Sequence, residues 1–114
     1  MTIFEKALII HLVADWLLQN DWMANHKASI RHWAAWIHGS IHFLGMLLIF
    51  SLPVALALGA THMLIDTRKP LTWWRGVFRQ TQISENVHAG WHVAIWSDQV
   101  VHLTCIALAI WLTL

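Results

Sequence analysis

Residues 3–18 read IFEKALIIHLVADWLL, an apolar stretch that carries one histidine and one carboxylate four residues apart. On a helix, residues at this spacing lie on one face, so His11 and Asp15 would be neighbours. Three later apolar stretches repeat the arrangement. Their pairs are His38 and His42, His62 and Asp66, and Asp98 and His102. Four polar pairs on four apolar segments predict an all-α protein whose helices bring these side chains together.

The four-residue spacing is more frequent than the composition predicts. Counting His88 with His92, five pairs of a histidine with a histidine or carboxylate are spaced this way, where about two are expected by chance. Four of the five fall one to each expected helix. The spacing is therefore a structural signal.

The composition predicts a membrane protein. Of the 114 residues, 58% are hydrophobic and 11% are charged, whereas soluble domains carry about 25% charged residues. Nine tryptophans and no tyrosine are present, and tryptophan concentrates at membrane–water interfaces. The net charge of +1 gives no support to nucleic-acid binding. The single Cys105 excludes a disulfide framework and a cysteine-based zinc site.

We expect residues 1–114 to form one transmembrane domain, an integral-membrane antiparallel four-helix bundle. The expected spans are about residues 3–18, 29–50, 53–66 and 88–113. The two longer links hold most of the basic residues, so the positive-inside rule places both links in the cytoplasm and both termini outside.

The link at residues 70–86 is expected to lie in the membrane interface. One side of a helix there would carry Trp73, Trp74, Val77 and Phe78. This is typical of an interfacial amphipathic helix between the third and fourth spans. A loop anchored by tryptophans is the alternative.

In an up-and-down bundle the polar pairs form two layers about one helical turn apart. Because helix direction alternates, one layer collects histidines and the other mostly aspartates. The histidine layer is His11, His42, His62 and His102. The aspartate layer, nearer the cytoplasm, is Asp15, His38, Asp66 and Asp98.

These layers predict a metal centre. An aspartate within the membrane costs about 2.5–3.5 kcal/mol even on mild insertion scales, so three of them need partners. Imidazole and carboxylate suit a divalent ion such as zinc, iron or manganese, and eight ligands could hold two ions. Asp15, Asp66 and Asp98 are the candidates for a catalytic metal and the four histidines for a second, with Gln99 hydrogen-bonded beside them. The alternative is that these groups only pair with one another, as structural hydrogen bonds.

A metal near the cytoplasmic interface favours a metal-dependent hydrolase, because a bound cation activates water and polarises a phosphoryl oxygen. Basic side chains at the same end would hold an anionic lipid or another phosphorylated, lipid-like substrate. They are Arg68, Lys69, Arg75 and Arg79. Two alternatives stay open, a metal-ion transporter or sensor and a haem protein with two axial histidines. The expected partner is the lipid bilayer, and a homo-oligomer is compatible with the sequence.

The order of these motifs resembles the domain-of-unknown-function family 3307, a family of small bacterial membrane proteins. The resemblance rests on HLVAD at 11–15, LQNDWMA at 18–24, Lys27, His38, His42, HMLID at 62–66 and DQVVH at 98–102. It covers nearly the whole chain except the link at 67–88. It implies a bacterial inner-membrane location and no particular activity. More loosely, HMLID looks like a motif of membrane proteins labelled metal-dependent hydrolases.

Overall fold

The computed structural model describes residues 1–78 and 87–113, without the side chains of residues 87–93. All regular secondary structure in these residues is helical, so the expected all-α class is confirmed. The helices are α1 (Ile3–Trp16), α2 (Asp21–His26), α3 (Trp33–Met46), α4 (Leu52–Asp66), α5 (Lys69–Val77) and α6 (Val87–Thr113).

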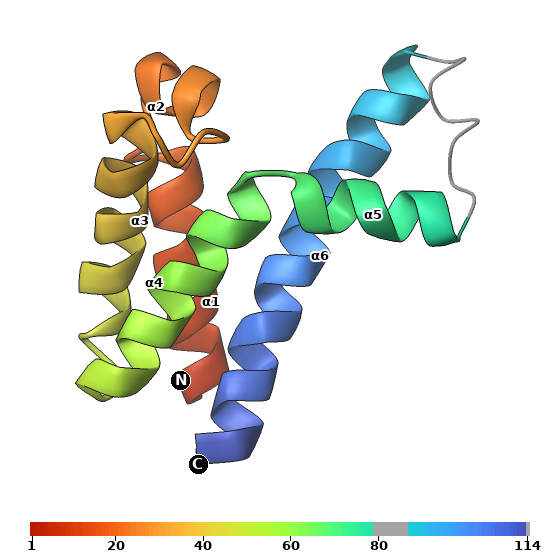
Figure 1. The fold of residues 1–114 in the computed structure, drawn as a ribbon. Helices are drawn as coiled ribbons and strands as arrows, with labels where there is room; N and C mark the ends of the chain where they lie inside the picture. The colour runs from red at the N-terminus through yellow and green to blue at the C-terminus, as the bar shows by residue number, and fades with distance from the viewer. Residues whose placement is uncertain (79–86, 114) are drawn as a thin grey trace.

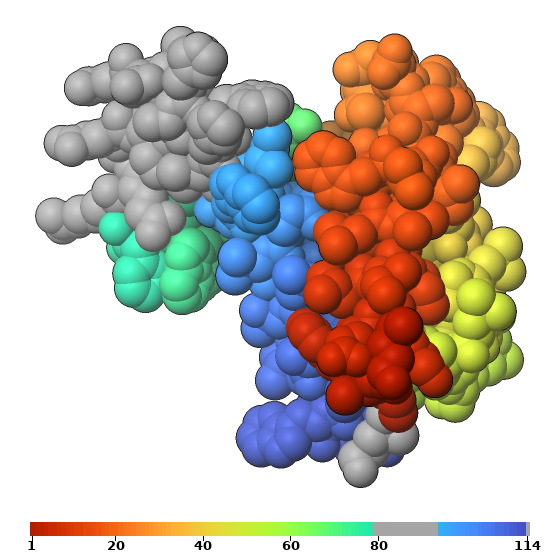
Figure 2. Space-filling view, turned by 180° about the vertical axis from the view of Figure 1, so that it is seen from behind, coloured from red at the N-terminus to blue at the C-terminus, as the bar shows by residue number. Residues whose placement is uncertain are grey.

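Four of these helices surround a shared interior. α1 contacts α3 and α6, and α4 contacts the same two helices from the other side. The short helix α2 packs on α3, and α5 packs on α4 and projects sideways at the end away from the termini (Figure 1). Seen from behind, α1 and α6 run side by side (Figure 2). The polar pairs thus come from four helices that face one another.

The helices are shorter than the expected spans. α6 contains Ala94–Thr113, which is long and apolar enough to cross a membrane; no other helix of the described residues meets both criteria. α1, α3 and α4 have 14, 14 and 15 residues, or roughly 21–23 Å against a hydrocarbon core of roughly 30 Å. The expected spans 3–18 and 29–50 are therefore too long. Helix length alone does not support four spans.

The segment expected in the membrane interface is helical in its first part. α5 covers Lys69–Val77, so the alternative of a loop is wrong there. Leu71 is buried against the rest of the molecule, whereas Trp73 and Trp74 are 67% and 46% exposed. The remainder of this segment, residues 79–86, lies outside the described residues.

An apolar core fills the half of the molecule near the termini. It is built from Ala7, Met46, Phe50, Ala55, Leu58 and Ile106. Next to it, α3 and α4 approach closely at Gly59, where an added Cβ would lie 3.1 Å from the Cβ of Phe43 and 3.6 Å from its Cα. Small residues at helix contacts allow this closeness. The polar pairs lie beyond this core, toward α2 and α5.

We expect Gly59→Leu to lower the free energy of unfolding by about 1–3 kcal/mol, because the new side chain would push against the backbone of α3. Gly76→Leu is the matched control, since nothing lies within 4 Å of a Cβ at that position in α5. It should be neutral or slightly stabilising, because leucine favours a helix more than glycine does. Thermal unfolding followed by circular dichroism measures both. Equal effects would show that α3 and α4 do not pack as closely as described.

Candidate metal centre

Seven polar side chains are buried where α1, α3, α4 and α6 meet. They are His11, Asp15, His38, His42, His62, Asp66 and His102, none more than 6% exposed. All seven belong to the eight residues that the sequence singles out. The eighth, Asp98, is 21% exposed at its side chain and lies 3.5 Å from Nε2 of His102. The structure therefore brings the whole predicted set into one cluster, with Asp98 at its edge.

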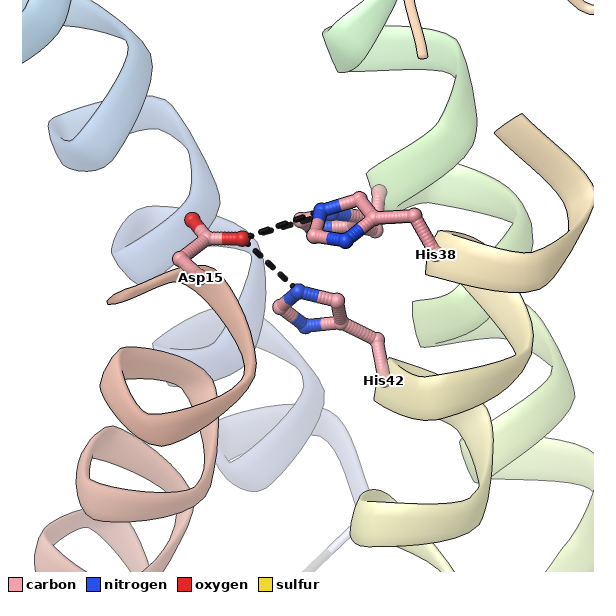
Figure 3. A group of neighbouring side chains, drawn as sticks. Asp15, His38 and His42 are labelled. Atoms are coloured by element: carbon pink, nitrogen blue, oxygen red, sulfur yellow. Dashed lines mark hydrogen bonds and ion pairs between the residues drawn. The ribbon is translucent and has the colours of Figure 1, made fainter. Parts of the chain in front are cut away.

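The carboxylate of Asp15 connects α1 to α3 and α6. Its Oδ1 lies 2.8 Å from Nε2 of His42 and 3.1 Å from Nε2 of His38. Figure 3 shows both imidazoles projecting from α3 toward this oxygen. Its Oδ2 accepts a hydrogen bond of 3.2 Å from Nε2 of Gln99 and lies 3.4 Å from Nε2 of His11. Both oxygens of this buried carboxylate are thus in polar contact.

Asp66 plays the equivalent part on α4. Its Oδ2 lies 2.9 Å from Nε2 of His62 and 3.5 Å from Nε2 of His38. Its Oδ1 lies 3.3 Å from Nε2 of His102 and 3.7 Å from Nζ of Lys27. His38 therefore stands between the two aspartates, and the Asp15 and Asp66 surroundings form one continuous network.

The four members of the histidine layer are neighbours. The ring centroids of His42 and His62 are 3.5 Å apart, and those of His62 and His102 are 4.2 Å apart. His11 completes the layer at 5.2 Å from both His42 and His102. His38 is also near, at 4.8 Å from His42. The histidine layer therefore exists as a group, but the aspartate layer is not separated from it.

Two overlapping groups could each hold a metal ion. In one, single ligand atoms of Asp15, His38, His42 and His62 lie within 4.8 Å of one another; in the other, those of His62, Asp66 and His102 do. Each group combines members of both layers. The expectation of one metal in the aspartate layer and another in the histidine layer is therefore not what these groups offer. His62 is common to both, and one nitrogen can coordinate only one ion at a time.

The contacts of two histidines test whether this chemistry suits a cation. Nε2 of His38 and Nε2 of His62 are buried and form no hydrogen bond among the described contacts, although aspartate oxygens lie 3.1 and 2.9 Å away. Buried polar atoms are almost always hydrogen-bonded. Imidazole nitrogens and carboxylate oxygens that converge without hydrogen-bond geometry are compatible with a divalent ion between them.

Two predicted residues support the cluster from its side. Gln99 was expected to be hydrogen-bonded beside the ligands, and its Oε1 lies 2.9 Å from Nε2 of His11 while its amide donates to Asp15. His11 belongs to neither ligand group. Gln99 and His11 are thus placed to hold Asp15 in position, as residues behind a metal ligand commonly do.

A cavity of about 560 Å³ lies against the aspartates. Three acidic residues, Asp15, Asp66 and Asp98, line it together with three basic ones, Lys27, Arg68 and Arg75. Apolar side chains such as Trp16 and Leu71 complete the lining. This volume falls within the range of about 300–1,000 Å³ that is typical of small-molecule sites. The cluster therefore has a space beside it that could admit a ligand.

The expected anion-binding residues are placed unequally. Arg68 and Arg75 line the cavity, whereas Lys69 is not among its lining residues and Arg79 lies outside the described residues. Arg68 adopts a φ of 65°, the left-handed region, between α4 and α5. Sequence reasoning missed Lys27 as a cavity residue. The only sequence signal for Lys27 was its presence in the family motif, because Lys27 is not part of any of the four-residue polar pairs.

The family described as "Protein of unknown function (DUF3307)" matches residues 3–114. The chain belongs to the DUF3307 family. The resemblance seen in the motifs is thereby confirmed, and it extends through the link at 67–88. No curated protein and no solved structure matches the chain. The function of this DUF3307 protein must therefore be inferred from its site.

We expect His62→Ala to weaken metal binding in both ligand groups, whereas His42→Ala should affect only the group around Asp15. Losing a side chain that only supports a metal ligand costs roughly 10–100-fold in metal affinity, and losing a ligand should cost at least as much. Zinc titration of the purified protein by calorimetry gives the stoichiometry and affinity. His26→Ala is the matched control, because His26 is exposed and stacks on His32 outside the cluster. An equal loss in all three variants would contradict the assignment.

Proposed function

We propose that this DUF3307 protein is a metal-dependent hydrolase of the bacterial inner membrane, acting on a phosphorylated or lipid-like substrate near the cytoplasmic face. One observation carries the proposal. The buried histidine and aspartate cluster borders a cavity whose basic lining residues are Lys27, Arg68 and Arg75. Metal ligands and cations around one cavity are a combination that can stabilise the charge of a transferring phosphoryl group.

The position of each residue relative to the cavity suggests its role in the reaction. His62, Asp66 and His102 would hold one ion, with Asp66 also lining the cavity, and the ion would supply Lewis-acid activation of water and of the phosphoryl oxygen. Asp98 lines the cavity, is partly exposed and lies beside His102. It is placed to accept a proton from a water that attacks phosphorus and to return that proton to the ester oxygen, which leaves as the alcohol when its bond to phosphorus breaks.

Two arginines would hold the substrate anion. A guanidinium presents paired N–H donors that match phosphate oxygens. Arg75 lines the cavity, and its buried Nε has no hydrogen-bond partner among the described residues. Arg68 lines the same cavity although its left-handed backbone is unfavourable for a residue with a side chain. Strained backbone is often found at functional sites.

The outer surface supports placement in a membrane. Large apolar side chains point outward, among them Leu12, Trp36, Leu44, Leu64, Val100 and Leu108, each between 39% and 60% exposed. Histidines, aspartates and alanines occupy much of the interior. This is the reverse of the distribution in a water-soluble domain. We infer an integral-membrane bundle of α1, α3, α4 and α6, with the exposed tryptophans of α5 in the interface.

The cluster supports hydrolysis better than the two alternatives. A transporter needs a polar path on both sides, but the apolar core that includes Phe50, Leu58 and Ile106 lies between the histidines and the terminal end. A haem with two axial histidines needs them on opposite faces of the porphyrin. The imidazoles of His42 and His62 are stacked at 3.5 Å, and the cavity beside them has about 20 Å³, room for about one water.

We expect the protein to remain in the membrane pellet when membranes are washed with alkaline carbonate or urea, because its apolar surface would be covered by lipid. Immunoblotting of pellet and supernatant measures this. A peripheral membrane protein of the same cells is the control that should be released. Recovery of the chain in the supernatant would contradict insertion into the membrane. It would not contradict the proposed metal centre.

We expect zinc- or manganese-dependent release of phosphate from a short-chain phosphatidic acid in detergent micelles. Asp98→Asn should lower kcat by about 10²–10⁴-fold with little change in metal content, because a proton acceptor is lost. Arg68→Gly should instead raise KM and leave thermal stability equal or higher, since glycine tolerates the left-handed backbone.

Phosphate release that is independent of metal, or equal in wild type and Asp98→Asn, would contradict the proposed chemistry. Metal flux into liposomes without any phosphate release would favour the transporter.

A further inference from the structure

Lys27 is the basic side chain that links the cavity to the metal centre. Its Nζ lies 3.7 Å from Oδ1 of Asp66, and it lines the cavity with Arg68 and Arg75. The Lys27 side chain is 16% exposed and that of Asp66 is 3% exposed. The ammonium of a mostly buried lysine side chain therefore lies against a carboxylate that also belongs to a candidate ligand group.

The backbone that carries Lys27 is held in place. Asn20 caps α2, because its side-chain Oδ1 accepts a hydrogen bond of 2.9 Å from the N–H of Met23. Met23 is buried, and the N–H of Lys27 donates to the Met23 carbonyl at 2.9 Å. The lysine begins from a fixed Cα on a flexible four-carbon side chain. Movement of its ammonium between neighbouring partners requires only rotamer changes.

Asp66 cannot serve Lys27 and a metal ion equally. Its Oδ1, the atom next to Nζ of Lys27, is also 3.3 Å from Nε2 of His102 in the group His62, Asp66 and His102. A divalent ion in this group would neutralise the charge that attracts the ammonium and would repel it. An anion bound in the cavity that Lys27 lines would then attract the displaced ammonium.

We propose that Lys27 couples metal binding to anion binding. A cation held by His62, Asp66 and His102 displaces the Lys27 ammonium from Asp66 into the cavity, where it joins Arg68 and Arg75 around a phosphate. The inference rests on the proposed function in needing a cation at this group. Because binding linkage is reciprocal, the anion in turn tightens the metal. The substrate's phosphate is thereby held best when the centre carries its ion.

The first test compares zinc affinity in phosphate-free buffer, by calorimetry on the full chain in detergent. Lys27→Met removes the competitor for Asp66, so zinc should bind at least about fivefold more tightly, the lower end of typical coupling between sites. Lys69→Met is the matched control, because Lys69 is exposed and absent from the cavity lining; its zinc affinity should equal that of wild type. Lys27→Arg should return the affinity toward the wild-type value.

The second part adds methylphosphonate, a phosphate mimic that resists hydrolysis. In wild type it should tighten zinc binding, and in Lys27→Met the tightening should shrink by at least about fivefold. Arg75→Met should weaken methylphosphonate binding without altering zinc affinity in its absence, because Arg75 does not contact Asp66 among the described ion pairs.

A third measurement needs no variant and applies even if Lys27→Met does not fold. Reductive methylation followed by mass spectrometry should modify Lys27 of the wild type at least about fivefold faster with zinc than without, while Lys69 stays unchanged. Unchanged Lys27 reactivity overturns the proposal, as does zinc affinity in folded Lys27→Met that is equal to wild type or weaker. Failure of the wild type to bind zinc, manganese or iron would overturn the proposed function itself.

Discussion

The structure depends on two buried carboxylates and the histidines that surround them. Removing an unpaired carboxylate from water is costly, and the cost is offset only when charge and hydrogen-bonding partners are supplied. Asp15 and Asp66 receive theirs from α1, α3, α4 and α6 together. A shift of any one helix by a turn would separate a carboxylate from its polar partners on that helix. The polar network therefore sets the register of four helices whose apolar faces alone would allow many alignments.

Close backbone packing makes this network reachable. The imidazoles of His42 and His62 stack at 3.5 Å because α3 and α4 approach at glycines. A Cβ on Gly59 would meet Phe43, and one on Gly39 would meet Met63 at 2.5 Å. Larger residues at these positions would separate the helices and pull the stacked rings apart. The polar cluster thus depends on the small residues that let α3 and α4 pack closely.

The sequence predicted the cluster but not its connections. A four-residue spacing reports which residues share a helix face, so the eight candidate ligands could be found without coordinates. It does not report how far each side chain reaches. Imidazoles span most of a helical turn, so His38 contacts both aspartates and the two expected layers merge. Helix ends were overestimated because Leu17 and Leu18 continue the apolar pattern beyond α1. Lys27 reaches Asp66 through the packing of α2 on α3, which no spacing in the sequence encodes.

Charge balance explains why the cavity and the metal centre belong to one site. Its lining contains three acidic and three basic side chains, whose formal charges cancel, so the cavity without a cation has little preference for an anion. A divalent ion on the aspartates would leave the cavity with a net positive charge in a partly enclosed space, where screening by water is weak. The same aspartates that recruit the ion thus decide whether Arg68 and Arg75 can attract a phosphate. Such a site would attract an anion only while the metal ion is bound. The substrate would therefore be held only when the ion that activates it is present.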